Sequence, residues 1–175
     1  MKKQLLHSGW QLTTVGKNDT IPATVPGSVY NDLLNAGRME DPYWRDNEMK
    51  ALALMDEDYR YNTTFDVNAD VLNSERVLLR CEGLDTIADI VLSGEKIASV
   101  CNMHRTWEFN VKDSLKTTGN TLEIVFHSPT KYIKEQDKIC HAGGSEDAMV
   151  GFPNLRKAHC MFGWDLSLIH ICRCR

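Results

Sequence analysis

Tyr59-Arg60-Tyr61-Asn62-Thr63-Thr64-Phe65-Asp66-Val67 is the stretch that decides the fold class of this chain of 175 residues. Aromatic or β-branched residues occupy every second position, and polar residues occupy the positions between them. A period of two is typical of a β-strand with one buried face, whereas a helix repeats every 3.6 residues. The stretch therefore predicts a strand over 59–67 that packs on a core.

Further strands follow, and glycine or asparagine residues lie in the segments between them. We expect these strands over 77–81, 87–92, 96–101, 107–111 and 122–126. The run 77–81 is almost continuously apolar, which favours a strand covered on both faces. Ser93-Gly94-Glu95-Lys96 is a hairpin signal between two of the strands. Short strands joined by such turns predict a mostly β fold, built as a β-sandwich.

Two short helices are predicted among the strands. Ser28 precedes an apolar helical pattern as an N-cap, and Gly37 follows it as a C-terminal stop. Ser128-Pro129 opens the second helix, over Thr130–Cys140, with proline in the first turn, where its missing N–H does no harm.

The composition fits one soluble globular domain, with 42% hydrophobic and 25% charged residues. A net charge of −4 argues against a nucleic-acid surface or a polybasic membrane anchor. Met-Lys-Lys at the start is not followed by the apolar run of a signal peptide, and no run approaches the ~20 apolar residues of a membrane span. We therefore expect a cytoplasmic location without membrane attachment.

Of the six cysteines, the four before Leu166 are scattered singly, without a CxxC spacing: Cys81, Cys101, Cys140 and Cys160. This pattern argues against a metal site and favours reduced thiols, which suits the cytoplasm. The sequence also lacks the G-x-S-x-G, phosphate-loop and HExxH motifs. We therefore assign no catalytic residue, metal or cofactor from spacing.

Five segments resemble, in family order, the N-terminal domain of β-mannosidases of glycoside hydrolase family 2. These segments are Val25–Leu34, Asp41–Glu48, Glu82–Ala88, Asn102–Arg105 and Arg156–Asp165. Together they run through nearly the whole chain as far as Asp165. The family typically continues with Trp-Gly-Pro, so the departure begins at Leu166.

The last ten residues differ in character from the rest of the chain. Leu166–Ile171 resembles the in-frame translation of a transposase adaptor used in DNA library preparation, and Arg173-Cys174-Arg175 fits the same adaptor. We therefore expect a domain over 1–165, a non-native tail over 166–175, and a natural protein that continues past Asp165. The alternative is a native short apolar strand with a basic end.

The resemblance implies a galactose-binding-like jelly-roll sandwich, often called the sugar-binding domain of these enzymes. In the family, an immunoglobulin-like domain and a (β/α)₈ barrel follow it, and the barrel supplies both catalytic glutamates. This chain is then the inactive N-terminal part of an exo-acting, retaining β-mannosidase that needs no organic cofactor. Its partners would be a β-mannoside substrate and those downstream domains, to which it supplies the rim of the mannose pocket.

The resemblance also indicates the substrate-binding residues. Trp164 and Asp165 lie in the Gly-Trp-Asp loop that reaches towards the barrel in the family. An indole face packs on the C–H face of a pyranose, and a carboxylate accepts hydrogen bonds from two hydroxyls. Arg45 and Asn47 are weaker candidates, in a loop placed to reach the same pocket.

Each of these residues has a structural alternative. Trp164 would seal the interface with the barrel, Asp165 would cap a turn, and local hydrogen bonds would hold the loop of Arg45 and Asn47. Other conspicuous residues are predicted to be structural rather than sugar-binding. Trp10, Trp44 and Trp107 are expected to be core or domain-packing aromatics, and Asn102 and Arg105 to hold local structure or an interface.

Three other functions remain open at this point. The chain could be the same domain of another family 2 enzyme, a β-galactosidase or a β-glucuronidase. It could be a stand-alone carbohydrate-binding module, which requires the tail to be native. It could also be a scaffold that only braces the barrel, in which case neither Trp164 nor Asp165 touches substrate. A domain separated from its barrel would expose an apolar interface and be poorly soluble.

Overall fold

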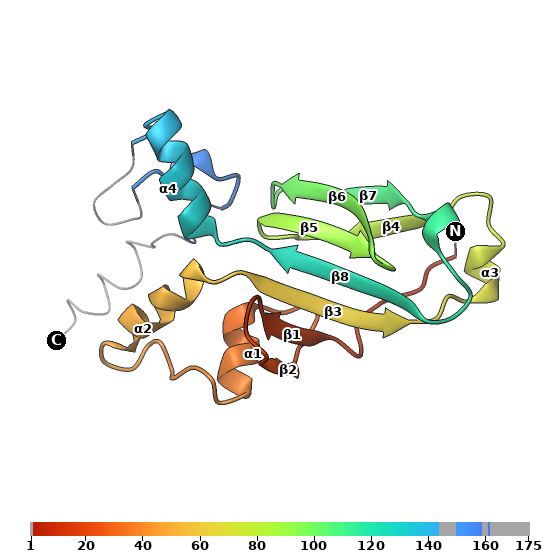
Figure 1. Ribbon diagram of the computed structural model, residues 1–175, viewed down its shortest axis with the longest axis horizontal. Helices are drawn as coiled ribbons and strands as arrows, with labels where there is room; N and C mark the ends of the chain where they lie inside the picture. The colour runs from red at the N-terminus through yellow and green to blue at the C-terminus, as the bar shows by residue number, and fades with distance from the viewer. Residues whose placement is uncertain (1, 144–149, 159–160, 162–175) are drawn as a thin grey trace.

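Two antiparallel sheets form the body of the protein (Figure 1). The computed structural model describes residues 2–143, 150–158 and 161. The larger sheet has the strand order β2-β1-β3-β8-β5-β6, and the smaller one pairs β4 with β7. The strands are β1 (Gln11–Thr14), β2 (Thr20–Pro22), β3 (Tyr59–Phe65), β4 (Leu78–Cys81), β5 (Ile87–Leu92), β6 (Glu95–Cys101), β7 (Trp107–Asn110) and β8 (Asn120–Phe126).

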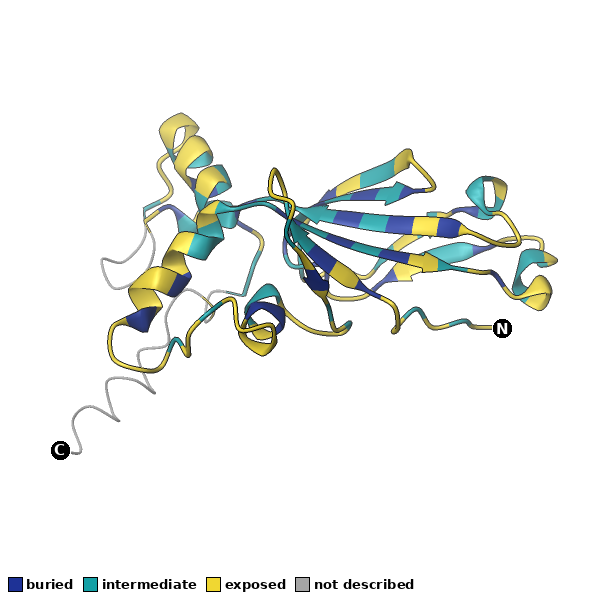
Figure 2. Ribbon diagram, turned by 60° about the horizontal axis from the view of Figure 1, so that its bottom comes forward, coloured by how far each residue is buried: buried dark blue, intermediate teal, exposed yellow. Residues whose placement is uncertain are grey.

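Alternating side chains of the central strands build the core, as the predicted period of two requires (Figure 2). On β3, Tyr59, Tyr61 and Thr63 are buried. One cluster of buried residues joins β3, β5 and β8 of the large sheet to β4 of the small sheet, and Trp107 and Phe109 of β7 pack against it. The predicted sandwich is therefore confirmed, although β3 ends at Phe65 rather than at residue 67.

The predicted hairpin at Ser93-Gly94 is confirmed as a two-residue turn between β5 and β6. Ser93 and Gly94 have φ of 50° and 87°, and Leu92 pairs with Glu95. Positive φ at both central positions matches the right-handed twist of the flanking strands, which explains why glycine stands there.

Both predicted helices are present. Helix α1 (Val29–Asn35) begins after Ser28, whose hydroxyl accepts a hydrogen bond from Asn31 N at 3.3 Å. Helix α4 (Pro129–Ile139) begins after Ser128, whose hydroxyl accepts from Lys131 N at 3.2 Å. In each case a side chain satisfies an N–H that lacks a partner within the helix.

Several elements were not predicted. The expectation of one or two short helices was too low, because the described residues also contain α2 (Asn47–Ala53) and α3 (Ala69–Leu72). Three 3₁₀ turns accompany them: η1 (Leu54–Asp56), η2 (Lys112–Ser114) and η3 (Phe152–Asn154). Strands β1 and β2 were missed because each buries a single residue, Leu12 or Ile21, so no alternation is visible. None of the described helices is long and apolar enough to cross a membrane.

Strand β4 is less buried than its sequence predicted. Leu78 and Leu79 are half-buried and Arg80 is exposed. Val77, Leu79 and Cys81 belong to the core or pack against it, whereas Leu78 and Arg80 do not, so β4 packs through one face and the expected coverage on both faces was wrong.

Helices α2 and α4 lie together at one end of the sandwich with η1 and η3, and we call this group the helical end (Figure 1). Helix α3 and the N-terminus lie at the opposite end in both views (Figures 1 and 2). Side chains at 56–58, next to α2, fix the start of α4. Asp58 Oδ1 accepts from Ser128 N at 2.8 Å, and Asp56 Oδ1 accepts from the Thr130 hydroxyl at 2.5 Å.

Candidate functional site

Two of the four predicted site residues lie at the helical end, and the other two fall outside the described residues. Arg45 lies in the turn before α2, and Asn47 is the first residue of α2. Trp164 and Asp165 are among the residues that the structure does not describe. Their predicted contacts with substrate therefore stay predictions.

Asn47 is held inside the domain. It is 9% exposed, its Nδ2 donates to Asp41 O at 3.0 Å, and its Oδ1 accepts from Lys50 Nζ at 3.4 Å. The expectation that Asn47 lies in a loop is wrong, because it begins a helix. Its amide fixes the turn that leads into α2, as the structural alternative predicted.

Arg45 is exposed and has a left-handed backbone, with φ of 55°. Its guanidinium lies 5.6 Å from the centroid of the Trp44 ring. A residue with a side chain adopts this backbone at a cost of about 1–2 kcal/mol, so the surrounding turn imposes it. The turn thereby presents Arg45 and Trp44 to solvent as a cation–π pair.

The segment that precedes Trp164 and Asp165 is anchored to the sandwich. Asn102 and Arg156 form a parallel bridge, and Met103 N donates to Arg156 O at 3.1 Å. Ala158 N lies 3.0 Å from Met103 Sδ, and Leu155 is 2% exposed. Residues 155–158 therefore have a fixed position beside the loop that follows β6.

An ion pair strengthens this anchor. Lys157 Nζ pairs with Asp85 Oδ2, and the two side chains are 19% and 28% exposed. Partial burial reduces screening by water, so this pair is stronger than a fully exposed one. The ion pair and the bridge bring Arg156 and Lys157 together with two other segments that the sequence analysis singled out, 82–88 and 102–105. Their spacing in the sequence gave no sign of this contact.

The tryptophans follow the prediction in part. Trp10 is 6% exposed, and its Nε1 donates to Leu6 O at 2.8 Å. Trp107 Nε1 donates to Asn102 O at 3.1 Å, and Arg105 lies 4.4 Å from the Trp107 ring centroid. Asn102 and Arg105 thus hold local structure, as predicted. Trp44 is not a core residue, because it is 63% exposed.

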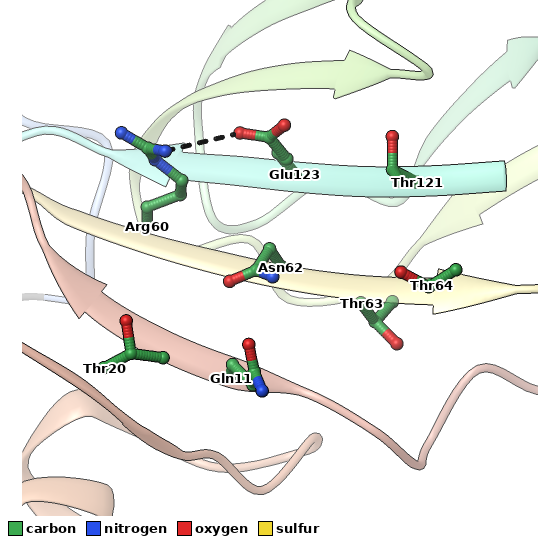
Figure 3. Close-up of a pocket in the computed structure, with 8 residues that line it drawn as sticks. All are labelled: Gln11, Thr20, Arg60, Asn62, Thr63, Thr64, Thr121 and Glu123. Atoms are coloured by element: carbon green, nitrogen blue, oxygen red, sulfur yellow. Dashed lines mark ion pairs between the residues drawn. The ribbon is translucent and has the colours of Figure 1, made fainter. Parts of the chain in front are cut away.

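A shallow polar hollow of about 210 Å³ lies on the outer face of the large sheet (Figure 3). Gln11, Asn62 and Glu123 form one row across three neighbouring strands, and Arg60 Nη1 lies 3.8 Å from Glu123 Oε2. Four threonines complete the lining: Thr20, Thr63, Thr64 and Thr121. These side chains offer hydrogen bonds to a polar ligand but provide no aromatic face for a sugar ring. The sequence analysis did not identify this hollow, because Gln11 and Thr20 lie on strands that it did not predict.

The described residues contain no group of three or more His, Cys, Asp or Glu residues placed to hold a metal ion. Cys81, on β4, is buried, and burial raises the pKa of its thiol to about 11. Its thiolate is therefore scarce at neutral pH, and Cys81 is a core residue rather than a nucleophile.

Comparisons with known proteins show what the chain resembles. Residues 10–171 match a family model described as the glycosyl hydrolase 2 galactose-binding domain-like family. β-Mannosidase of Bos taurus is 29% identical over 178 residues, which covers 91% of this chain and 19% of that protein. β-Mannosidase A of Emericella nidulans is 34% identical over 166 residues, which covers 89% of this chain and 17% of that protein.

A solved structure resembles the fold closely. The β-D-mannosidase of Dictyoglomus thermophilum superposes with a TM-score of 0.86 at 35% identity, covering 91% of this chain and 20% of that chain. The chain therefore spans about a fifth of the length of the relatives that it matches.

Proposed function

The chain belongs to the glycosyl hydrolase 2 galactose-binding domain-like family, and from this premise we propose that it is the N-terminal, non-catalytic domain of an exo-acting, retaining β-mannosidase. The observation that carries the proposal is the close similarity, in sequence and in fold, to β-mannosidases about five times longer. The two catalytic carboxyl groups would lie in the remainder of such a protein, about 5–5.5 Å apart, as a retaining mechanism requires.

The domain would contribute to the substrate pocket through Trp164 and Asp165. Support comes from the anchored segment that leads to them, because Arg156 and Lys157 are fixed to Asn102 and Asp85. A short connection to a fixed point restricts where these two side chains can reach. The indole would pack on the apolar face of the terminal mannose, and the carboxylate would accept hydrogen bonds from its hydroxyls.

Arg45 and Asn47 would have different roles in this proposal. Arg45 is exposed, with its guanidinium over the Trp44 ring, and this position at the surface suits contact with substrate or with the barrel. Asn47 is buried and hydrogen-bonded to Asp41, so it would position the turn that carries Arg45. The cytoplasmic location expected from the sequence remains part of the same proposal.

The proposal is tested with Asp165→Ala in the longer parent protein. Charge-assisted hydrogen bonds of about 1.5–3 kcal/mol correspond to a loss of about 10- to 150-fold in kcat/KM on an aryl β-mannoside. The matched control is Asp70→Ala, because Asp70 lies on α3, at the end of the sandwich away from the helical end, and forms a surface ion pair with Lys2. Unchanged kcat/KM for Asp165→Ala would remove Asp165 from the site and favour a scaffold role.

A panel of aryl glycosides tests the choice within family 2. Preference for β-mannosides supports the proposal, whereas preference for β-galactosides or β-glucuronides would assign the domain to another enzyme of the family.

A second candidate is a carbohydrate-binding module that acts alone, for which the polar hollow of Figure 3 would supply hydrogen bonds without an aromatic face. Such a module would bind mannosides as the 175-residue chain, and Asn62→Ala would abolish the binding. An edge of an enzyme pocket would bind them poorly without its barrel. Titration calorimetry with mannose and a mannobiose separates the two functions.

A further inference from the structure

The outer face of the large sheet carries a row of polar side chains at the floor of the hollow in Figure 3. Gln11 on β1 pairs with Asn62 on β3, and Asn62 pairs with Glu123 on β8. Neighbouring strands lie about 4.8 Å apart, so the row crosses about 10 Å of the sheet. Thr64, two residues after Asn62, adds a hydroxyl on the same face.

The hydrogen-bonding groups of this row are open to a ligand. Within the part of the chain that the structure describes, the side-chain amides of Gln11 and Asn62 and the hydroxyl of Thr64 make no hydrogen bond. No fully buried side-chain nitrogen or oxygen lacks a partner among the described residues, so these three groups face solvent. By contrast, the Thr13 and Thr20 hydroxyls, on the same face, lie 3.0 Å apart and bond to each other. The row therefore holds donors and acceptors that the fold itself does not use.

The hollow is shallow, which limits how a ligand can lie in it. Its volume of about 210 Å³ is below the ~300–1,000 Å³ of pockets that enclose a small molecule. Thr63 also lines it, but this side chain is 3% exposed and its hydroxyl donates to Ser8 O at 3.2 Å, so it belongs to the inner face. A ligand would therefore lie across the strands. Because each hydrogen bond contributes little alone, an extended chain with many contacts fits better than a single sugar.

Charge and side-chain type select the class of ligand. Arg60 Nη1 lies 3.8 Å from Glu123 Oε2, and the other described residues that line the hollow are neutral. Opposite charges that offset each other give no preference for an acidic polymer or a nucleic acid. None of the described lining residues is aromatic or aliphatic, which argues against an apolar ligand. Amides, a carboxylate and a guanidinium together donate to and accept from hydroxyl groups, so a neutral polyhydroxylated chain fits.

We propose that the hollow binds a neutral β-mannan chain in the longer parent protein, through hydroxyl groups of several sugar units. This inference rests on the proposed function, which makes β-linked mannose the glycan that the protein meets. Gln11 and Asn62 each present an amide to the chain, and Glu123 accepts hydrogen bonds from its hydroxyls. The stand-alone module differs, because it would bind mannose and mannobiose as the 175-residue chain, whereas this shallow hollow holds short sugars weakly.

Affinity electrophoresis of the longer parent protein tests the inference. Its migration is compared in native gels with and without galactomannan, a neutral polymer with a β-linked mannose backbone. We expect galactomannan to retard the wild type, and Asn62→Ala or Gln11→Ala to weaken the apparent affinity about fivefold, because each removes an amide that bonds to the polymer. Asn110→Ala is the matched control, since Asn110 is an exposed asparagine on β7 of the small sheet. It should migrate as the wild type does.

Several outcomes would overturn the inference. A wild type that galactomannan does not retard is one, and undiminished retardation of Asn62→Ala and Gln11→Ala is another. Loss of retardation in Asp165→Ala, with full retardation in Asn62→Ala, would assign the polymer to Asp165 instead. Gln11 and Asn62 lie on different strands, so if one variant fails to fold, the other decides. A parent protein that is inactive on aryl β-mannosides, but whose retardation depends on Asn62, would contradict the proposed function and leave the hollow as a glycan site.

Glu123→Gln tests whether the ion pair keeps the hollow selective for a neutral ligand. The variant retains the shape of the side chain but leaves Arg60 without its carboxylate. We expect polygalacturonate, an anionic polymer, to retard Glu123→Gln severalfold more than the wild type. Glu108→Gln is the matched control, because Glu108 pairs with Arg80 at 3.4 Å on the small sheet and makes the same change in net charge. Equal migration of the two variants overturns the inference, as does a wild type retarded by polygalacturonate but not by galactomannan.

Discussion

At the scale of single residues, Asp32 is a buried carboxylate that stabilises the fold through hydrogen bonds. It is 2% exposed in α1, and its two carboxylate oxygens accept from the Tyr61 hydroxyl at 2.9 Å and from Thr24 N at 3.0 Å. Burial, and then the hydrogen bond to Asp32, raise the pKa of Tyr61, so its hydroxyl stays protonated and donates. Asp32 thereby ties α1 and the segment before it to β3.

Asp32→Ala is expected to reduce the free energy of unfolding by about 3 kcal/mol, because it leaves the buried Tyr61 hydroxyl and the Thr24 N–H without their acceptor. The midpoint of urea denaturation measures this loss. Asp19→Ala is the control, since Asp19 forms a surface ion pair with Arg38 at 2.9 Å whose removal should cost at most about 0.5 kcal/mol. Equal effects of the two substitutions would contradict the assigned role.

Asp89, on β5, determines part of the acid sensitivity of the fold. Hydrogen bonds from Ser99, Lys96 and His127 lower the pKa of Asp89 to about 2. The unfolded chain has an aspartate pKa of about 3.9, so ionised Asp89 stabilises the fold above pH 4. This contribution is lost as the pH falls from about 4 to about 2.

Asp89→Asn should therefore reduce stability at pH 7 by about 1 kcal/mol, a value that allows for solvent screening. The difference from the wild type should shrink as the pH falls and vanish near pH 2. Urea titrations at a series of pH values measure it. A difference that stays constant from pH 7 to pH 2 would show that the charge of Asp89 is not responsible.

At the scale of elements, the two predicted helices begin at serines with unequal tasks. Ser28 is exposed, and its hydroxyl accepts one helical N–H. Ser128 is 2% exposed, and its hydroxyl both accepts from Lys131 N and donates to Met55 O at 2.5 Å. Ser128 thus joins α4 to η1 as well as capping it.

Ser128→Ala should reduce the free energy of unfolding by about 2 kcal/mol, and Ser28→Ala by about 1 kcal/mol or less. The larger loss has a physical cause, since Ser128→Ala also leaves Met55 O without this donor in a partly buried position. Thermal or urea unfolding of the two variants, measured side by side, provides the comparison. A larger loss for Ser28→Ala would be the opposite of what this geometry predicts.

At the scale of the whole molecule, the domain boundary is the prediction still to be tested. The sequence predicts that 1–165 is the native domain and that 166–175 is not part of it, whereas the family match extends to residue 171. Deleting 166–175 should leave the melting temperature of the chain unchanged within about 1 °C, because a non-native tail contributes no core packing. A drop of several degrees in the melting temperature would indicate that part of 166–175 belongs to the native domain. Sequencing the source locus from an independent library would then show which residues follow Asp165.

Local sequence patterns were sufficient to predict the central strands and the two capped helices. Tyr59–Phe65 alternates visibly, Ser93-Gly94 specifies a tight turn, and Ser28 and Ser128 mark helix starts, because each signal acts over a few neighbouring residues. For the candidate site, the sequence alone identified the family segments and the types of residue suited to sugar binding.

Only the tertiary structure showed which of the family segments contact one another and which of their residues are buried. The Asp85–Lys157 ion pair joins residues 72 positions apart, and no local pattern encodes such a contact. The sequence placed Asn47 in a loop, but it is buried in α2, because Asp41 O accepts its amide N–H. The outward direction of Met49 and Leu52 also depends on which face of α2 the sandwich covers. Hydrophobic periodicity shows that a helix has two faces, whereas the packing of distant segments decides which face is buried.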